Sequence, residues 1–323
     1  MTAQATGDAP ATTFSELFNT IAANIEIVIQ GKPEVVELAL VCLLAEGHLL
    51  IEDVPGVGKT SLAKALAASI DSSWKRVQFT PDLLPSDVVG VTVWNRGRDV
   101  FEFRPGPVFA NIVLGDEINR ASPKTQSALL EAMEERQVTV DGTTYPLAHP
   151  FMVIATQNPI EHEGTYPLPE SQLDRFLMRL SVGYPSRQYE LEILDTHASG
   201  GTLSEVHPVA TADQIQSLVD AVKAIHVAPA LKHYLVDLAD ATRRHPNVAL
   251  GMSPRATLAL QRAARARAAA AGRTYIIPDD IKALADPVLS HRLVLSSDAQ
   301  LQGINAGKVV ADVLGAVPVP TGK

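Results

Sequence analysis

The sequence predicts an α/β protein: an αβα sandwich around a parallel five-stranded sheet, followed by an all-α domain. Short apolar runs alternate with helical patterns up to about Tyr184, and helical patterns rich in Ala and Leu dominate beyond that point. Continuous apolar runs are typical of strands that are buried on both faces of a parallel sheet. The predicted strands are HLLIE at 48–52, RVQF at 76–79, NIVLG at 111–115, FMVIAT at 151–156 and FLMRLSV at 176–182.

The same change of pattern divides the chain into regions. Residues 1–12 are small and polar, and we expect them to form a disordered tail. The α/β domain is predicted to span 13–184, a linker 185–201 and the helical domain 202–323.

Composition limits the classes of function. The 323 residues are 46% hydrophobic and 20% charged, with a formal net charge of −9. This acidic balance disfavours a nucleic-acid partner, because binding to phosphate backbones depends on basic patches. No apolar run reaches the ~20 residues that a membrane span needs, and the N-terminal residues lack signal-peptide character, so we expect a cytoplasmic protein. Cys42 is the one cysteine and lies in an apolar run, which indicates a buried, inert thiol.

A phosphate-binding loop is indicated by LLIEDVPGVGKTSL at 49–62, where a predicted strand gives way to a helix. The pattern is G-x-x-x-x-G-K-[ST], except that Asp53 stands where the first glycine is expected, so its carboxylate would have to point away from a nucleotide. Lys59 would reach the β- and γ-phosphates of ATP, and the Thr60 hydroxyl would ligate Mg²⁺. The alternative is a glycine-containing turn with a surface lysine. The residues expected to bind the nucleotide are Pro55, Gly56, Val57, Gly58, Lys59, Thr60 and Ser61.

Polar residues follow two further predicted strands. Asp116 and Glu117 come directly after NIVLG, where Asp116 would hold Mg²⁺ and Glu117 would polarise the attacking water. Asn158 ends FMVIATQNP and could orient that water beside the γ-phosphate. Adjacent acids also occur where helices begin, and an Asn before Pro159 is also a turn-former.

The order of the phosphate loop, the acidic pair and the strand-terminal Asn resembles that of the AAA+ ATPases. The residues in and around these motifs resemble the MoxR family in particular. The segments that carry the resemblance are GHLLIEDVPGVGKTSLAKALA, FRPGPVFANIVLGDEINRASPKTQSALLEAMEE, ATQNPIEHEGTYPLPESQLDRFLMRL and GMSPRA. It runs from about Phe14 to about His291. An Asp before VPGVGKT is familiar in that family, so Asp53 does not disqualify the loop, and Gly115 before the acids is a minor departure.

The resemblance implies roles for two arginines. Arg175, in LPESQLDRFLMRL, matches the arginine finger that acts on a neighbouring subunit's ATP, and Arg179 is the second candidate. The alternative is an ion pair of Arg175 with Asp174 or Glu170. Arg255, in GMSPRA, matches the sensor 2 arginine of the lid domain, which contacts ATP phosphates. The alternative for Arg255 is a solvated surface side chain.

Two insertions also fit the resemblance. Residues from about 80 to 107 resemble the helix-2 insertion, and those from about 136 to 149 match the pre-sensor-1 hairpin. In the second, Asp141-Gly142 between alternating residues indicates a type I′ turn. In relatives such loops point towards the pore of a ring and can engage clients; passive surface hairpins are the alternative.

The resemblance therefore implies a Mg-dependent ATPase that forms a ring, expected to be a hexamer, and that remodels or activates a protein partner. Such relatives commonly act with proteins that carry von Willebrand factor A domains, in metal insertion or complex maturation. A nucleotide-gated adaptor that barely hydrolyses ATP is the alternative. A transcription activator is disfavoured because GAFTGA is absent, and a GTPase because N-K-x-D is absent. His162, in EHEG, is interpreted as a loop residue rather than a metal ligand.

Overall fold

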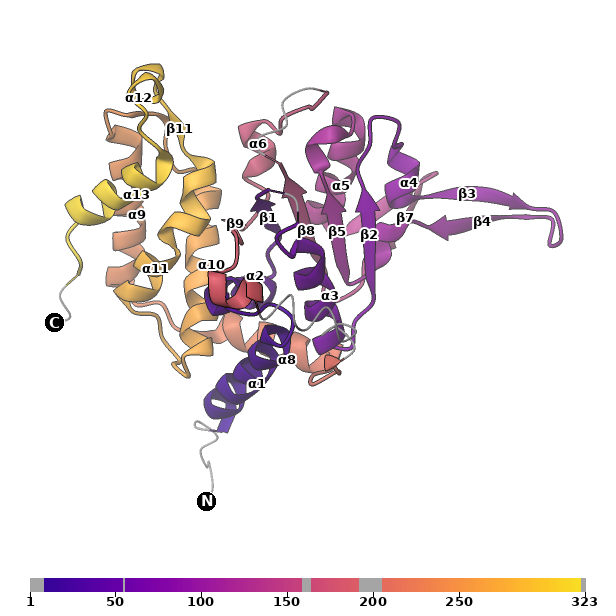
Figure 1. Ribbon diagram of the computed structural model, residues 1–323, viewed down its shortest axis with the longest axis horizontal. Coiled ribbons are helices and arrows are strands. Elements are labelled where there is room, and N and C mark those ends of the chain that lie inside the picture. Colours follow the sequence, from indigo (N-terminus) through magenta and orange to yellow (C-terminus); the bar gives the residue numbers. More distant parts are fainter. Residues whose placement is uncertain (1–8, 55, 159–163, 192–204, 321–323) are drawn as a thin grey trace.

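The computed structural model has a parallel five-stranded sheet at its centre, with the strand order β2-β5-β8-β1-β9 (Figure 1). It describes residues 9–54, 56–158, 164–191 and 205–320. The strands are β1 Leu49–Glu52, β2 Trp74–Gln78, β5 Ile112–Asp116, β8 Met152–Gln157 and β9 Met178–Leu180. All four strand pairs are parallel, so the predicted fold class is confirmed. Each predicted apolar run contributes one strand, with ends shifted by a few residues.

Helices cover both faces of this sheet. Leu49 and Ile51 of β1 pack in the cluster that contains the first three helices, whereas Leu50 between them packs in the cluster on the opposite face. This alternation is the period of two that a strand imposes on its side chains. The helical elements of this domain are α1 Ala9–Glu26, α2 Pro33–Leu44, α3 Lys59–Ser69, α4 Pro85–Val89, η1 Pro107–Phe109, η2 Ile118–Arg120, α5 Pro123–Glu135 and α6 Glu170–Leu173.

Two predicted irregular segments are partly helical. Helix α1 begins at Ala9, so the tail predicted for 1–12 was wrong over its last four residues, and 1–8 lie outside the described residues. The predicted linker, 185–201, is helical at 187–191, and its residues from 192 onwards are not described. The Tyr189 ring lies directly against Gly31, where an added Cβ would come within 2.3 Å of it. Packing against the turn between α1 and α2 thus accompanies helical structure in a linker segment whose local composition predicts none.

Cys42 in α2 is fully buried, as predicted for an inert thiol. Burial strongly raises the pKa of this thiol, and the charges of Arg262 and Arg292 offset only part of that shift. The protonated thiol is a poor nucleophile.

Both predicted insertions form β-hairpins. Strands β3 Gly90–Asn95 and β4 Val100–Pro105 project away from the body of the molecule (Figure 1). Strands β6 Gln137–Val140 and β7 Thr143–Pro146 form the second hairpin. Its turn residues have positive φ values, 49° at Asp141 and 79° at Gly142, as a type I′ turn requires.

The C-terminal region is a lid of packed helices beside the sheet (Figure 1). Its elements are α8 Ala212–Ala224, α9 Pro229–Arg244, α10 Pro254–Ala270, α11 Pro278–Leu289, η4 Ser290–Arg292, α12 Ser297–Leu301 and α13 Ala306–Ala316. It differs from the all-α prediction by one antiparallel ribbon, β10 Val248–Leu250 with β11 Val294–Leu295, whose strands are too short to leave a periodic signal. One hydrophobic cluster runs from α1 and α2 into α10, so sheet domain and lid share a core. Over the described residues, no helix has the length and apolar character that crossing a membrane requires.

Candidate functional site

The predicted phosphate loop lies where β1 ends and α3 begins at Lys59. Gly56 and Gly58 have φ values of 87° and 89°, in the left-handed region that glycine adopts without steric cost. The Lys59 ammonium donates a hydrogen bond to the backbone oxygen of Asp53 at 2.9 Å, which folds its side chain back over the loop. Pro55 lies outside the described residues. The loop therefore combines glycine-dependent backbone with a helix N-terminus, which is the arrangement that binds phosphate.

Asp53 directs its carboxylate away from the loop. Oδ2 accepts hydrogen bonds from the Gly183 backbone N–H at 2.6 Å and from the Ser181 hydroxyl at 3.1 Å, and Oδ1 accepts one from Val54 N–H at 2.9 Å. Burial alone would raise the pKa of Asp53, but these donors together hold it below its ordinary value. Asp53 thus ties the end of β1 to the segment after β9, which explains why an acid is tolerated where the pattern has glycine.

Asp116, the predicted Mg²⁺ ligand, and Glu117, the predicted base, are oriented by a threonine on the neighbouring strand. The Thr156 hydroxyl on β8 donates to Asp116 Oδ1 at 2.6 Å and accepts from the Glu117 backbone N–H at 2.9 Å. The other oxygen of Asp116, Oδ2, pairs with Arg76 at 2.5 Å. Strands β5 and β8 are adjacent and parallel, so their carboxyl ends meet at the sheet edge where ligands of such folds bind.

Glu117 lies in a left-handed backbone conformation with φ of 56°, which is uncommon outside glycine. Its Oε2 accepts a hydrogen bond from Gln78 Nε2 at 2.7 Å and pairs with Arg120 at 3.1 Å. Arg76 in turn donates to Gln78 Oε1 at 2.9 Å. Polar contacts therefore link Asp116 to Glu117 through two side chains of β2.

These side chains surround one cavity of about 390 Å³. Its lining residues are Gly56, Gly58, Lys59, Thr60, Ser61, Arg76, Gln78, Asp116, Glu117 and Asn158. Asn158 is only 6% exposed, and it lies at the end of β8 beside the acids. Val57 is not in this lining and packs instead against the hydrophobic core.

Sequence reasoning missed Arg76 and Gln78. Both lie on β2, whose inward-facing residue is the buried Val77 between them. Polar residues near the carboxyl end of a predicted parallel strand were the available signal, because that edge of the sheet forms the ligand crevice.

The donors in this cavity suit a magnesium ion bound with a nucleotide. Mg²⁺ prefers oxygen ligands and is usually held by one or two carboxylates together with phosphates and waters. Thr60 and Asp116, which carry a hydroxyl and a carboxylate, both line the cavity. Among the described residues there is no group of three or more His, Cys, Asp or Glu that could hold a metal by itself. The residues present therefore fit a metal that arrives with phosphate ligands.

Arg175 lies away from this cavity, just after α6. Its guanidinium pairs with Glu134 of α5 at 2.8 Å and donates to the Leu130 backbone oxygen at 2.8 Å. The ion pair with Asp174 or Glu170, weighed above as an alternative, is therefore not the one formed. Arg175 also lines a second cavity of about 480 Å³, most of whose other polar residues come from α5. The second finger candidate, Arg179, pairs with Glu52 at 3.0 Å.

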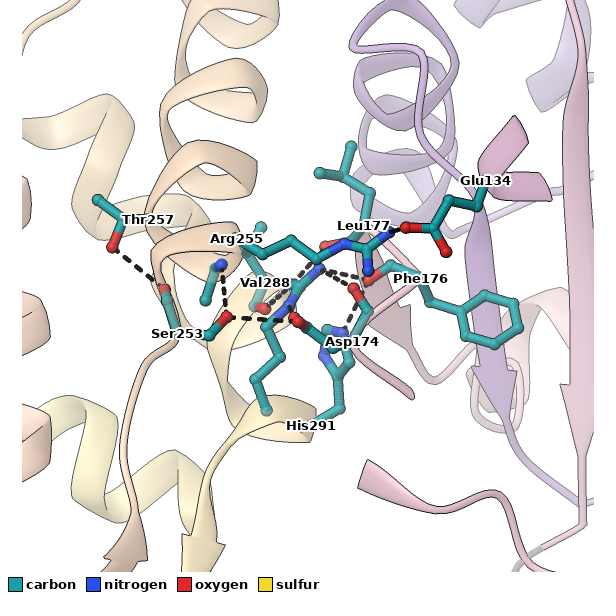
Figure 2. A network of polar contacts seen from close by, with 11 residues as sticks. Glu134, Asp174, Phe176, Leu177, Ser253, Arg255, Thr257, Val288 and His291 are labelled. Carbon is teal, nitrogen blue, oxygen red and sulfur yellow. Dashed lines mark hydrogen bonds and ion pairs between the residues drawn. The ribbon is translucent and has the colours of Figure 1, made fainter. Parts of the chain in front are cut away.

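Arg255 lies at the start of α10, where Ser253 caps the helix by accepting a hydrogen bond from Ala256 N–H at 3.0 Å. Figure 2 shows Arg255 reaching from the lid to Glu134, with 2.8 Å between Nη2 and Oε1. It is absent from the lining of the cavity beside Lys59. The structure thus brings Arg255 to the partner of Arg175, and we call Arg175, Arg255 and Glu134 together the arginine surface.

A phosphate loop, strand-terminal acids and a helical lid define the class of a P-loop ATPase of the AAA+ type. Comparisons agree, because a family model for the "ATPase family associated with various cellular activities (AAA)" matches residues 48–178 and one for the "AAA lid domain" matches 240–313. The protein YeaC of Bacillus subtilis is 51% identical over 94% of this chain and 95% of its own length.

"Chaperone MoxR1" of Mycobacterium tuberculosis is 44% identical over 92% of this chain and 80% of its own length. The crystal structure of a "putative ATPase" from Cytophaga hutchinsonii superposes with a TM-score of 0.90 at 36% identity, covering 97% of each chain. The chain belongs to the MoxR family of AAA+ ATPases.

Proposed function

We propose that this protein is a Mg-dependent ATPase that assembles into a ring, with six subunits as the expected number, and uses ATP to remodel or activate a protein partner. The observation that carries the proposal is the single cavity that joins Lys59, Asp116, Glu117 and Asn158, while Arg175 lies elsewhere. Such a subunit has the parts to bind and position ATP, but neither of the two finger candidates, Arg175 and Arg179, lines its own cavity.

The roles within the cavity follow from its chemistry. Lys59 contacts the β- and γ-phosphates, and backbone N–H groups of the loop cradle them. Thr60 and Asp116 would hold Mg²⁺, which when bound neutralises charge on the phosphate oxygens. Glu117 takes the proton of the attacking water, and Asn158 orients that water. Gln78 holds the Glu117 carboxylate until a nucleotide binds.

In the assembled ring, Arg175 and Arg255 act on the nucleotide of a neighbouring subunit. Both guanidiniums bond to the same carboxylate, Glu134, on a surface outside the subunit's own cavity. A guanidinium at the γ-phosphate stabilises charge in the transition state, so hydrolysis becomes dependent on assembly. Arg175 and Arg255 then exchange the Glu134 carboxylate for the neighbour's phosphates.

The partner is expected to be a protein, and by family resemblance one that carries a von Willebrand factor A domain. MoxR1, the relative at 44% identity, is named a chaperone. The projecting β3–β4 hairpin supports a role in partner contact, because Trp94 and Phe101 pack on each other there with ring centres 4.9 Å apart while Phe101 remains 72% exposed. A cytoplasmic location and the lack of a nucleic-acid partner stay predictions.

The test is steady-state ATP hydrolysis as a function of protein concentration, for the wild type, Glu117→Gln and Arg175→Ala. We expect the specific rate of the wild type to rise with concentration as subunits assemble, and both variants to lose turnover while still binding ATP. A specific rate that is independent of concentration, and is retained in Arg175→Ala, would contradict the trans-acting arginine.

A nucleotide-gated adaptor is the second candidate. It is favoured by one observation, that Asp116 and Glu117 are each held in an ion pair, with Arg76 and Arg120 respectively. If the wild type binds ATP without hydrolysing it at any protein concentration, and Glu117→Gln and Arg175→Ala behave in the same way, the adaptor function would be favoured over the ATPase.

A further inference from the structure

Arg292 is a buried arginine of the lid whose hydrogen bonds reach into the sheet domain. Its side chain is 3% exposed. Nε donates to the Asp174 carboxylate at 2.7 Å, Nη2 to the Phe176 backbone oxygen at 2.6 Å and Nη1 to the Leu177 backbone oxygen at 3.0 Å. A charge this deeply buried is tolerated only when it is paired and fully hydrogen-bonded. The acceptors that satisfy it come mostly from a single short segment of the other domain.

That segment contains Arg175. Arg292 also bonds the Asp174 backbone oxygen at 3.2 Å, so its guanidinium holds the chain on both sides of Arg175. Two further lid residues hold the same two positions: Ser253 donates to the Asp174 carboxylate at 3.3 Å, and His291 Nε2 bonds the Phe176 backbone oxygen at 3.0 Å. Figure 2 shows Ser253 and His291 beside Asp174 and Phe176, where the lid meets the sheet domain.

The side chain of Arg175 is not part of this network. It extends to Glu134 and the Leu130 backbone oxygen on α5. The lid therefore fixes the backbone from which Arg175 projects, and leaves its guanidinium on a surface where it can change partner.

We propose that Arg292 is the positioning residue for Arg175, so that the lid of one subunit sets the rate of ATP hydrolysis in its neighbour. This rests on the proposed function, in which Arg175 acts in trans. A change in lid position moves the Asp174–Leu177 segment through the Arg292 guanidinium, and the finger moves with it. The subunit's own nucleotide cavity is not touched by Arg292, because no residue of that cavity is among its partners.

Arginine is required for this role because its planar fork presents donors in several directions at once. A lysine keeps the charge, but its three donors on one nitrogen are too few for the Asp174 carboxylate and the four backbone oxygens that Arg292 bonds. We therefore expect Arg292→Lys to lower the turnover of the homogeneous assembly by about 10²-fold, the cost of a misplacement of about 1 Å at a reacting group. Its dissociation constant for ATP should match that of the wild type.

The deciding experiment uses full-length subunits with two different affinity tags, co-expressed and purified through both tags. Arg292→Lys is paired with Glu117→Gln, which cannot hydrolyse ATP but carries an intact finger. We expect the mixed assembly to hydrolyse ATP faster than the sum of the two homogeneous assemblies, because Glu117→Gln subunits supply fingers to intact Arg292→Lys cavities. A defect in general folding or in the subunit's own cavity would not be rescued in this way.

Two control pairs separate this inference from the proposed function. Arg175→Ala with Glu117→Gln must show the same rescue; if it does not, the trans-acting finger itself is wrong. Arg175→Ala with Arg292→Lys must show none, because both subunits then lack a working finger. If the first control pair is rescued and Arg292→Lys with Glu117→Gln is not, or if Arg292→Lys turns over like the wild type, the positioning role is overturned.

Asp174→Asn provides a second variant in case Arg292→Lys does not fold. It keeps the size of the side chain and one oxygen acceptor, but removes the charge that pairs with Arg292. We expect a smaller loss of turnover with the same rescue by Glu117→Gln and unchanged ATP affinity. A loss that Glu117→Gln does not rescue would again contradict the proposal.

Discussion

The nucleotide cavity and the arginine surface are built in different ways. The acids and the asparagine of the cavity follow the carboxyl ends of two adjacent strands, β5 and β8, and the loop follows β1. In the arginine surface, Glu134 of α5 meets Arg255 of α10 across 121 positions of sequence and from one domain to the other. The cavity is a property of the sheet domain alone, whereas the arginine surface gains Arg255 only when the lid is docked.

This difference indicates which of the two regions a regulator would change more readily. Parallel strands within a sheet are held by continuous backbone hydrogen bonds, so the cavity keeps its geometry as long as the domain is folded. The arginine surface depends on a few ion pairs between half-exposed side chains, which are individually weak and exchangeable. A partner or a neighbouring subunit that moves the lid would therefore change the arginine surface before it changes the cavity.

Glu117→Gln carries the largest expected effect and isolates the chemistry of the cavity. Removing a general base is expected to lower kcat by about 10²–10⁴-fold. ATP affinity should persist, because Lys59 and the loop are unchanged. Steady-state hydrolysis and equilibrium binding of a fluorescent ATP analogue measure the two quantities, with Glu16→Gln on the exposed side of α1 as a control. Wild-type turnover in Glu117→Gln would show that the base lies elsewhere.

Arg255→Ala tests whether the two regions are separate in function. We expect turnover to fall by about 10²-fold, the usual cost of removing one electrostatic contact to a transition state. If Arg255 serves the neighbouring nucleotide, mixed assemblies with Glu117→Gln will recover hydrolysis and mixtures with Arg175→Ala will not. If Arg255→Ala folds like the wild type but is not rescued by Glu117→Gln, Arg255 acts on the nucleotide of its own subunit. The cavity and the arginine surface would then not be separate in function.

The sequence predicted the cavity better than the arginine surface for a physical reason. Gly56, Gly58 and Lys59 act through local backbone geometry, and Asp116 and Glu117 act from the end of one strand. Contacts of this kind depend on neighbours in sequence and on the sheet edge, and both can be inferred from a pattern. The five strands were predictable for the same reason, since burial on both faces leaves continuous apolar runs.

The partners of Arg255 and Arg292 could not be inferred in this way. Nothing near Arg255 in sequence indicates that it pairs with Glu134, and nothing in SHRL indicates that Arg292 holds Asp174. These contacts depend on how the lid packs against the sheet domain through their shared core, which involves residues from α1 to α13. The helical residues 187–191 of the predicted linker were missed for a similar reason, because tertiary packing outweighs weak local propensity.

Asp53→Asn tests how firmly the loop is attached to the sheet. Because the folded pKa of Asp53 lies below its ordinary value of 3.8, its contribution to stability is complete above that value and is lost as the pH falls through 3.8 and then through the folded pKa. We expect Asp53→Asn to lower the free energy of unfolding by about 1–3 kcal/mol near neutral pH. The difference from the wild type should narrow below pH 3.8. Urea unfolding near neutral pH and below pH 3.8 measures this difference in the free energy of unfolding. A difference that widens in acid would contradict the assigned hydrogen bonds.

Arg76→Gln carries the smallest expected effect and concerns the ion pair that occupies Asp116 before a metal arrives. Arg76 is 47% exposed, so its pair with Asp116 is worth at most about 1 kcal/mol, or about 5-fold in an equilibrium constant. Freeing Asp116 should therefore tighten Mg-ATP binding by up to that factor, while binding of ATP without Mg²⁺ stays unchanged. Calorimetric titration with and without Mg²⁺ measures both, and Lys75→Gln removes an exposed charge one position away as a control. Weaker binding under both conditions would show instead that Arg76 contacts the nucleotide, and would make β2 a second source of phosphate ligands beside the loop.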